Sequence, residues 1–112
     1  MQMTTTGHDK ALIVAITGEI DHHTASTIKA NIEAAYNEHK ALDLLLDFSE
    51  VSFMDSSGIG MIMGRYKSLL PGGELRVFGV NAHVKKLFEL SGLTQIIALH
   101  DTQADAMAER KV

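Results

Sequence analysis

Short apolar runs alternate with segments of helical period along this chain, and that alternation constrains the fold more than any other feature. Residues 11–16 and 42–48 are apolar runs of strand length. Between them, the apolar side chains Ile28, Ile32 and Tyr36 recur at helical spacing, with polar residues on the other faces. Strands that alternate with helices imply right-handed crossovers and a largely parallel sheet.

The rest of the chain continues the pattern. A helix is predicted from about residue 57 to 70, where Pro71-Gly72-Gly73 stops it. A strand follows over 74–80, and Asn81 is placed to cap a helix that closes at Ser91-Gly92. We predict that the helix over 57–70 turns one apolar face to the core, made of Ile59, Ile62, Met63, Tyr66 and Leu70.

The two ends of the chain complete the predicted architecture. The polar segment 3–6 can pair antiparallel with the first buried strand through a turn at 7–10. A short strand over 95–99 and a terminal helix close the chain. We therefore predict one α/β domain over residues 1–112, with a mixed, mostly parallel sheet of four to five strands and about four helices.

Composition narrows the possible partners and chemistry. The 10 basic and 14 acidic residues give a net charge of −4, which argues against a nucleic-acid surface. No apolar run approaches the roughly 18 residues that a membrane-spanning helix needs, and the N-terminus lacks the pattern of a secretory signal. The absence of cysteine excludes disulfides and thiolate chemistry. We expect a cytoplasmic domain that binds neither nucleic acid nor membrane directly.

Two adjacent serines stand where the helix over 57–70 is predicted to begin. The segment Asp55-Ser56-Ser57-Gly58 follows an apolar strand and a short acidic stretch that we expect to be a loop. Serine and aspartate satisfy the free N–H groups of a first helical turn. The same donors and the positive end of the helix dipole also suit a phosphate. A serine here is either a helix cap or a phosphoacceptor.

Several polar residues are predicted to gather at one edge of the sheet. In parallel βαβ units, all strand-to-helix loops emerge at the carboxyl edge, where ligands usually bind. The loops in this chain bring an acid pair, a hydroxyl, an amide and an imidazole to that edge: Asp21, His22, Asp55, Ser56 and Asn81. We expect function to reside there.

Three glycines lie in the first two turns of the same helix. Gly58, Gly60 and Gly64 each cost roughly 0.8–1.0 kcal/mol relative to alanine. The lack of side chains at these positions allows either close packing on the sheet or access by a partner. The spacing of the glycines does not decide between these two explanations. Met61 falls outside the predicted apolar face, so we expect it to be exposed to a partner.

Other chemistries fit the residues less well. The three glycines match neither the Walker A nor the dinucleotide pattern, because Arg65-Tyr66 stand where Lys-Ser/Thr would be needed. No Gly-x-Ser-x-Gly elbow supports a hydrolase. Asp47 could mimic a receiver-domain phosphoacceptor, but no lysine follows the last strand. His22 and His23 lack a third ligand at metal-binding spacing. We predict no catalytic residue, no metal and no cofactor, and hence no enzyme.

Four blocks of sequence resemble the STAS family: Gly-Glu-Ile-Asp-His-His-Thr-Ala at 18–25, Phe-Met-Asp-Ser-Ser-Gly-Ile-Gly at 53–60, Gly-Arg-Tyr-Lys at 64–67 and Lys-Leu-Phe-Glu-Leu-Ser-Gly-Leu at 86–93. The resemblance runs in register from about Ala11 to Ile97. The block at 53–60 is similar to that of the phosphorylatable anti-sigma factor antagonists. The blocks at 18–25 and 64–67 favour the sporulation branch of these antagonists over the general-stress branch.

That resemblance implies a partner switch. The unphosphorylated antagonist binds an anti-sigma factor that is also a serine kinase, and so frees a sigma factor. The kinase phosphorylates the first serine of the motif, here Ser56, and the complex dissociates. A metal-dependent serine phosphatase restores the active form. Ser57 matches the second, non-acceptor serine, and Asp21 matches an acid near the partner surface. We expect the partner to contact Asp21, His22, Asp55, Ser57, Gly58, Ile59, Gly60 and Met61.

Two other classes of function stay open. One is a general-stress or transporter-associated STAS scaffold in which the serine is only a cap. The other is a small nucleotide-binding protein that uses the acids and glycines at the carboxyl edge. Calorimetry with nucleotides and pull-down of partners distinguish these classes from a partner switch.

Overall fold

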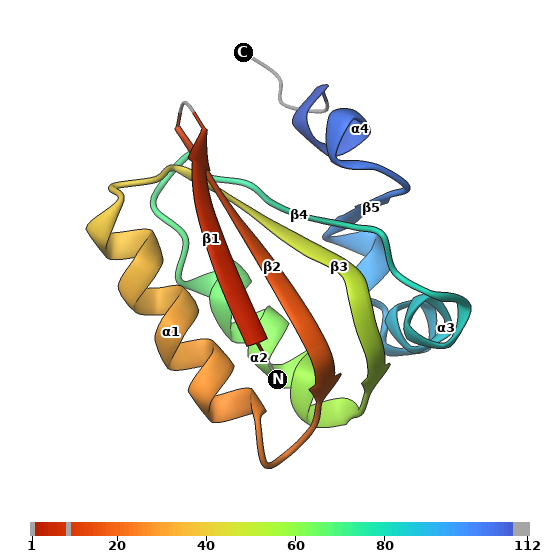
Figure 1. Ribbon diagram of the computed structural model, residues 1–112. Helices are drawn as coiled ribbons and strands as arrows, with labels where there is room; N and C mark the ends of the chain where they lie inside the picture. The colour runs from red at the N-terminus through yellow and green to blue at the C-terminus, as the bar shows by residue number, and fades with distance from the viewer. Residues whose placement is uncertain (1, 9, 109–112) are drawn as a thin grey trace.

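A five-stranded sheet in the order β1-β2-β3-β4-β5 forms the centre of the protein (Figure 1). The computed structural model describes residues 2–8 and 10–108. β1 pairs antiparallel with β2, and the other neighbours pair in parallel. The strands are β1 (Gln2–His8), β2 (Ala11–Ile20), β3 (Asp43–Met54), β4 (Leu75–Phe78) and β5 (Ala98–His100). The predicted mixed, mostly parallel α/β fold is confirmed.

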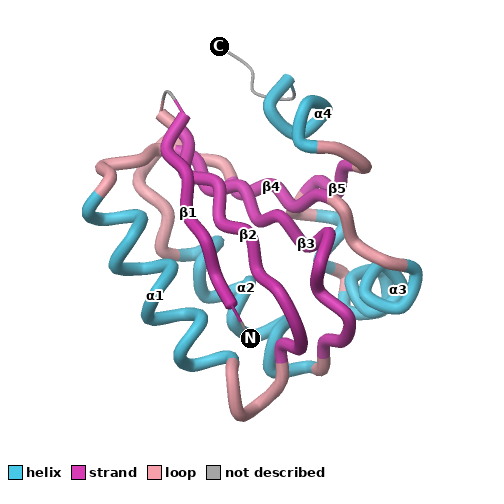
Figure 2. The backbone as a smooth tube through the Cα atoms, in the orientation of Figure 1, coloured by secondary structure: helices cyan, strands magenta, loops and turns pink. Residues whose placement is uncertain are grey.

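Helices cover the two faces of the sheet unequally (Figure 2). Three of them contribute buried side chains to the larger core, whereas the short C-terminal helix packs on the opposite face. They are α1 (Ala25–Glu38), α2 (Ser56–Lys67) and α3 (Ala82–Ser91) on one face and α4 (Gln103–Ala108) on the other, with a 3₁₀ turn, η1 (Leu93–Gln95), before β5. Within the described residues, no helix combines the length and apolarity needed to cross a bilayer.

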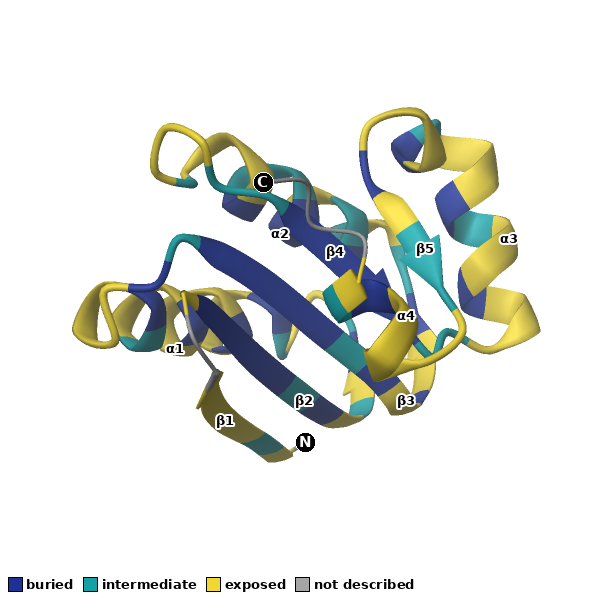
Figure 3. Ribbon diagram, turned by 90° about the horizontal axis from the view of Figure 1, so that it is seen from above, coloured by how far each residue is buried: buried dark blue, intermediate teal, exposed yellow. Residues whose placement is uncertain are grey.

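Alternate side chains of the central strands enter the two cores. Leu44 and Leu46 of β3 face the larger core under α1 to α3, while Leu45 faces the smaller core with Phe78 and Ala106. Figure 3 shows the resulting pattern, in which β2, β3 and β4 are mostly buried and the outer surfaces of the helices are exposed. Burial on both faces explains why these strands are continuous apolar runs rather than alternating ones.

β3 is longer than its apolar run predicts. The expected loop after residue 48 is strand in the structure, because β2 pairs with β3 as far as Ile20 opposite Met54. Two register shifts, between Ala15 and Thr17 and between Gly18 and Glu19, accommodate extra residues of β3 and keep the segment after Phe48 in the ladder. β3 therefore delivers Asp55 and Ser56 directly from the end of a strand, with no intervening loop.

Both predicted ends of α3 are confirmed. The side chain of Asn81 accepts a hydrogen bond from the Val84 N–H at 2.8 Å, as an N-cap does. Gly92 ends the helix in the left-handed conformation, with φ of 82°, which glycine adopts without strain. Asn81 also donates to the carbonyl of Val51 at 3.1 Å, so its side chain joins α3 to the end of β3.

Candidate functional site

Asp55, and not a serine, caps α2. The Ser57 N–H donates to Asp55 Oδ1 at 2.8 Å, and Asp55 has the extended backbone of an N-cap residue. Ser56 is the first helical residue and is exposed. Within the described part of the chain, its hydroxyl makes no hydrogen bond. The sequence left Ser56 as either a cap or a phosphoacceptor, and the structure removes the cap role.

The loop between β2 and α1 is organised around Asp21. Its Oδ1 accepts hydrogen bonds from the N–H of His23 at 2.9 Å and of Thr24 at 3.1 Å. The Thr24 hydroxyl donates to the Glu19 carbonyl, which ties the loop back to β2. The hydrogen bond from the His23 N–H is the main cause that lowers the pKa of Asp21, and the bonds from Thr24 add to it. Asp21 is therefore a carboxylate at neutral pH.

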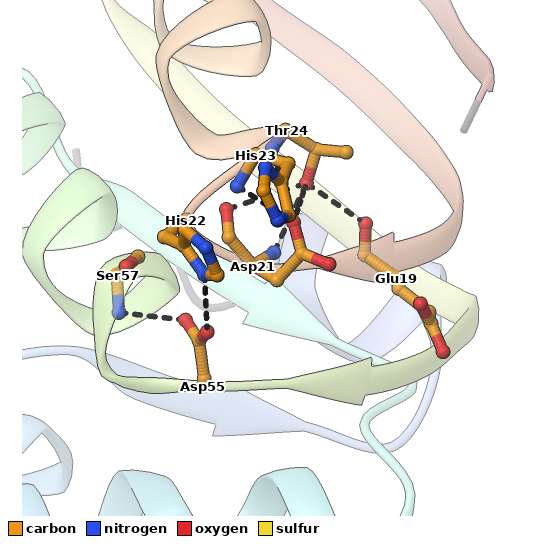
Figure 4. Close-up of polar contacts among 7 residues, drawn as sticks. All are labelled: Glu19, Asp21, His22, His23, Thr24, Asp55 and Ser57. Atoms are coloured by element: carbon orange, nitrogen blue, oxygen red, sulfur yellow. Dashed lines mark hydrogen bonds and ion pairs between the residues drawn. The ribbon is translucent and has the colours of Figure 1, made fainter.

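His22 joins this loop to the start of α2 (Figure 4). Its Nδ1 lies 3.9 Å from Asp55 Oδ2, with 69% of the His22 side chain and 31% of the Asp55 side chain exposed. The rings of His22 and His23 contact each other, with centroids 3.9 Å apart. Asp21, His22 and Asp55 thus come together at the carboxyl edge as predicted. Within the described residues, no group of three or more acidic or histidine side chains is arranged to hold a metal ion.

The glycines of α2 have two different explanations. Gly58 is buried, and a Cβ there would collide with the side chain of Met54 and approach Ile20 Cγ2 to 3.0 Å. Close packing on the sheet therefore requires this glycine. A Cβ at Gly60 or Gly64 would meet no atom within 4 Å, so packing requires neither. Gly60 is exposed and Ile59 is half-buried, close in sequence to the exposed Ser56.

The predicted exposure of Met61 is wrong, because Met61 is only 5% exposed and belongs to the larger core. The buried face of α2 is rotated from the predicted one. Tyr66, expected inside, is 38% exposed. Leu70, also expected inside, is 51% exposed because α2 ends at Lys67 and not at residue 70 as predicted. Glycine at 58 brings this side of the helix against the sheet, and Met61 follows it one turn later.

Arg65 completes the rotated face of α2, although sequence reasoning did not place it inside. Its side chain is 8% exposed, and Nη1 pairs with Glu33 Oε2 of α1 at 2.9 Å. The pairing compensates the charge that burial would otherwise leave unsatisfied. A lone arginine next to an apolar run gives no sequence signal of such a partner.

Phe53 is a further residue that the sequence analysis did not single out for the site. It stands at the end of β3, two residues before Asp55, and is 39% exposed. Its ring stacks on His83 of α3, with centroids 5.4 Å apart and an interplanar angle of 16°. An aromatic residue in a polar strand end is the one signal that could have drawn attention to it.

The comparison with known families matches the STAS domain to residues 2–106 of this chain. The chain belongs to the STAS family. This STAS domain is 38% identical over 106 residues to the anti-sigma F factor antagonist of Paenibacillus polymyxa, which covers 94% of this chain and 91% of that protein. It is 37% identical over 93 residues to the anti-sigma-B factor antagonist of Listeria monocytogenes, which covers 82% of this chain and 81% of that one.

Solved structures of SpoIIAA share the fold. The unphosphorylated form of this anti-sigma factor antagonist superposes with a TM-score of 0.81 at 28% identity, covering 95% of the STAS domain and 93% of that chain. The phosphorylated form of the Bacillus cell fate determinant SpoIIAA gives a TM-score of 0.73 at 27% identity, with 96% and 97% covered. The comparisons support an anti-sigma factor antagonist, which is a regulator and not an enzyme.

Proposed function

We propose that this STAS domain is a phosphorylation-controlled antagonist of sporulation type. Its unphosphorylated form binds an anti-sigma factor that is also a serine kinase. That kinase transfers the γ-phosphoryl group of ATP to Ser56: the new bond joins Ser56 Oγ to phosphorus, the bond to the β-phosphate breaks, ADP leaves, and the hydroxyl proton passes to the kinase or to water. The phosphorylated form dissociates from the kinase, and a metal-dependent serine phosphatase hydrolyses the phosphate ester and restores the unphosphorylated form.

One observation carries this proposal: Ser56 is exposed at the first position of α2 while Asp55 does the capping. The Ser56 hydroxyl therefore does not cap the helix and is accessible to a kinase. The relatives support the same reading, since SpoIIAA was solved in unphosphorylated and phosphorylated forms. Because a sigma factor acts on transcription, we expect the domain to work in the cytoplasm.

A phosphate on Ser56 is expected to alter binding and not folding. It adds about −1.5 to −2 charges at a helix N-terminus, where negative charge is favoured by about 0.3–1 kcal/mol. On the surface of the domain, the negative charge of the phosphate adds to that of the Asp21 and Asp55 carboxylates. A like-charge juxtaposition at an interface costs several kcal/mol, and each 1.4 kcal/mol weakens binding about tenfold. The phosphate thus releases a partner without unfolding the domain.

The proposed docking surface follows from which residues are accessible. Asp21, His22, Asp55, Ser57, Ile59 and Gly60 are exposed or half-buried around Ser56. Gly58 and Met61 lie behind them and support the surface from inside. Two carboxylates at its centre favour a partner that presents basic side chains there.

The sporulation assignment rests on two sequence blocks. Identity to the anti-sigma F and anti-sigma-B factor antagonists is almost the same, 38% and 37%. The Asp-His-His-Thr block at 21–24 and the Gly-Arg-Tyr-Lys block at 64–67 favour the sporulation branch. In the structure, the first block forms the loop that meets Asp55, and the second holds the buried Arg65.

Phosphorylation with labelled ATP and the cognate anti-sigma kinase tests the proposal. The wild-type protein and Ser57→Ala should both accept one phosphate, since Ser57 contributes its backbone N–H to the cap. Ser56→Ala should accept none and should still bind the kinase. Label on Ser56→Ala would overturn the assignment of the acceptor.

A further inference from the structure

A series of contacts through Asp55, His22, His23 and Asp21 leads from the start of α2 into the β2–α1 loop. His22 Nδ1 faces Asp55 Oδ2 at 3.9 Å, and the ring of His22 lies against that of His23. The His23 N–H donates to Asp21 Oδ1 at 2.9 Å. The carboxylate of Glu19 points away from this group (Figure 4). Among the described residues, the contacts thus place Asp55 from the α2 side and His23 and Asp21 from its own loop around His22.

The contact between His22 and Asp55 is loose in the unphosphorylated protein. A separation of 3.9 Å exceeds the range of about 2.7–3.2 Å for a hydrogen bond. Asp55 Oδ1 is engaged by the Ser57 N–H, so only Oδ2 faces His22. With 69% of its side chain exposed, His22 is free to change its partner.

We propose that His22 is the positioning residue that senses a phosphate on Ser56. The inference rests on the proposed function, in which Ser56 accepts the phosphate. A phosphate places about −1.5 to −2 charges next to Asp55, and His22, whose Nδ1 faces Asp55 Oδ2, can supply a compensating positive charge when it is protonated. As an imidazolium, His22 pairs with the phosphate and draws the β2–α1 loop toward α2.

This pairing means that phosphorylation changes the proposed docking surface both at Ser56 and at Asp21. Asp21 is on the same loop as His22 and is held there by the N–H groups of His23 and Thr24. A movement of His22 therefore displaces Asp21. Of the two acids in the proposed docking surface, Asp21 is more distant in sequence from Ser56 than Asp55 is. Phosphorylation then acts through the charge on Ser56 and also through the position of Asp21.

The titration of the phosphate itself tests the proposal. Phosphoserine is installed at position 56 by semisynthesis, without the kinase, and its ³¹P resonance is followed against pH. A free phosphoserine has a second pKa of about 6. A neighbouring imidazolium stabilises the dianion, so His22→Gln should raise the ³¹P midpoint by roughly 0.5 pH unit or more. His22→Arg, which restores a positive charge, should return the midpoint to the wild-type value or below it.

The matched control is His83→Gln, because His83 is also an exposed histidine but stacks on Phe53 of β3. It should leave the ³¹P midpoint unchanged. Backbone amide shifts of residues 21–24 should differ between the phosphorylated and unphosphorylated wild type and much less in His22→Gln. A midpoint that His22→Gln does not move would overturn the proposal. That result is independent of the kinase, whereas a Ser56 that the kinase fails to label would overturn the proposed function.

Discussion

Asp55 and Ser56 are adjacent, yet only Asp55 caps α2. Asp55 satisfies a free N–H of the first turn of α2 through Ser57. Ser56 is exposed, and its side chain takes no part in that capping bond. Because the stabilising group and the proposed acceptor are different side chains, stability and switching can be changed independently by mutation.

Replacement of each residue by alanine should show this separation. Asp55→Ala should lower the free energy of unfolding by about 1 kcal/mol, within the 0.5–2 kcal/mol typical of a lost N-cap. Ser56→Ala should change it by less than about 0.5 kcal/mol, as exposed substitutions usually do. Urea denaturation measures both. Equal losses in the two variants would mean that the serine shares the cap.

Asp21 should give the fold a distinct acid sensitivity. Its pKa is lowered from the ordinary value of 3.8 by the His23 and Thr24 N–H bonds, so the folded state favours the carboxylate. The resulting stability is present above the ordinary pKa and is lost as pH falls through the lower, folded value. In urea unfolding series, the stability difference between wild type and Asp21→Asn should be constant from pH 7 to 5 and shrink below pH 4. A difference that grows on acidification would contradict this.

At the scale of elements, the cap and the end of α3 could be predicted from the sequence, whereas the buried face and the end of α2 could not. The Asn81 cap and the Gly92 end of α3 are local signals, and both are confirmed. The phase of α2 was predicted from apolar side chains alone, and it is wrong because two of its buried residues are Gly58 and Arg65. A glycine buried by close packing and an arginine buried by a partner 32 residues away are tertiary effects.

The full length of β3 could not be predicted from the sequence either. Its second half, residues 49–54, mixes polar with apolar residues and does not continue the apolar run of the first half. Pairing with β2 across two register shifts keeps it extended to Met54. The site residues at the carboxyl edge, by contrast, could be predicted, because parallel topology alone brings Asp21, His22 and Asp55 to one edge.

Two alanine substitutions in α2 should have opposite effects on stability. Gly60→Ala should stabilise the fold by about 0.5–1 kcal/mol, since its Cβ meets no atom and alanine is the better helix former. Gly58→Ala should destabilise it by about 1–3 kcal/mol, because its Cβ collides with Met54. Thermal or urea unfolding checks the sign of each change. A destabilised Gly60→Ala would show that the helix there is packed more tightly than the structure indicates.

At the scale of the whole molecule, the two faces of the sheet form the cores that stabilise the fold, and the carboxyl edge carries the proposed binding surface. Both faces of the sheet are covered, by α1, α2 and α3 on one side and α4 on the other. The carboxyl edge is left for the β2–α1 turn and the start of α2 (Figure 1). Acidic side chains and the exposed Ser56 lie at this edge. Charge added at this edge meets solvent and not the core, so we expect the proposed phosphorylation to leave the domain folded.

The affinity of the phosphorylated and unphosphorylated proteins for the cognate anti-sigma factor tests this account most directly. Titration calorimetry on both forms, with circular dichroism to confirm that each is folded, separates binding from stability. We predict that the phosphate on Ser56 weakens binding at least about 100-fold, which corresponds to about 2.8 kcal/mol, with no loss of helical signal. Equal affinity of the two folded forms would contradict the central claim.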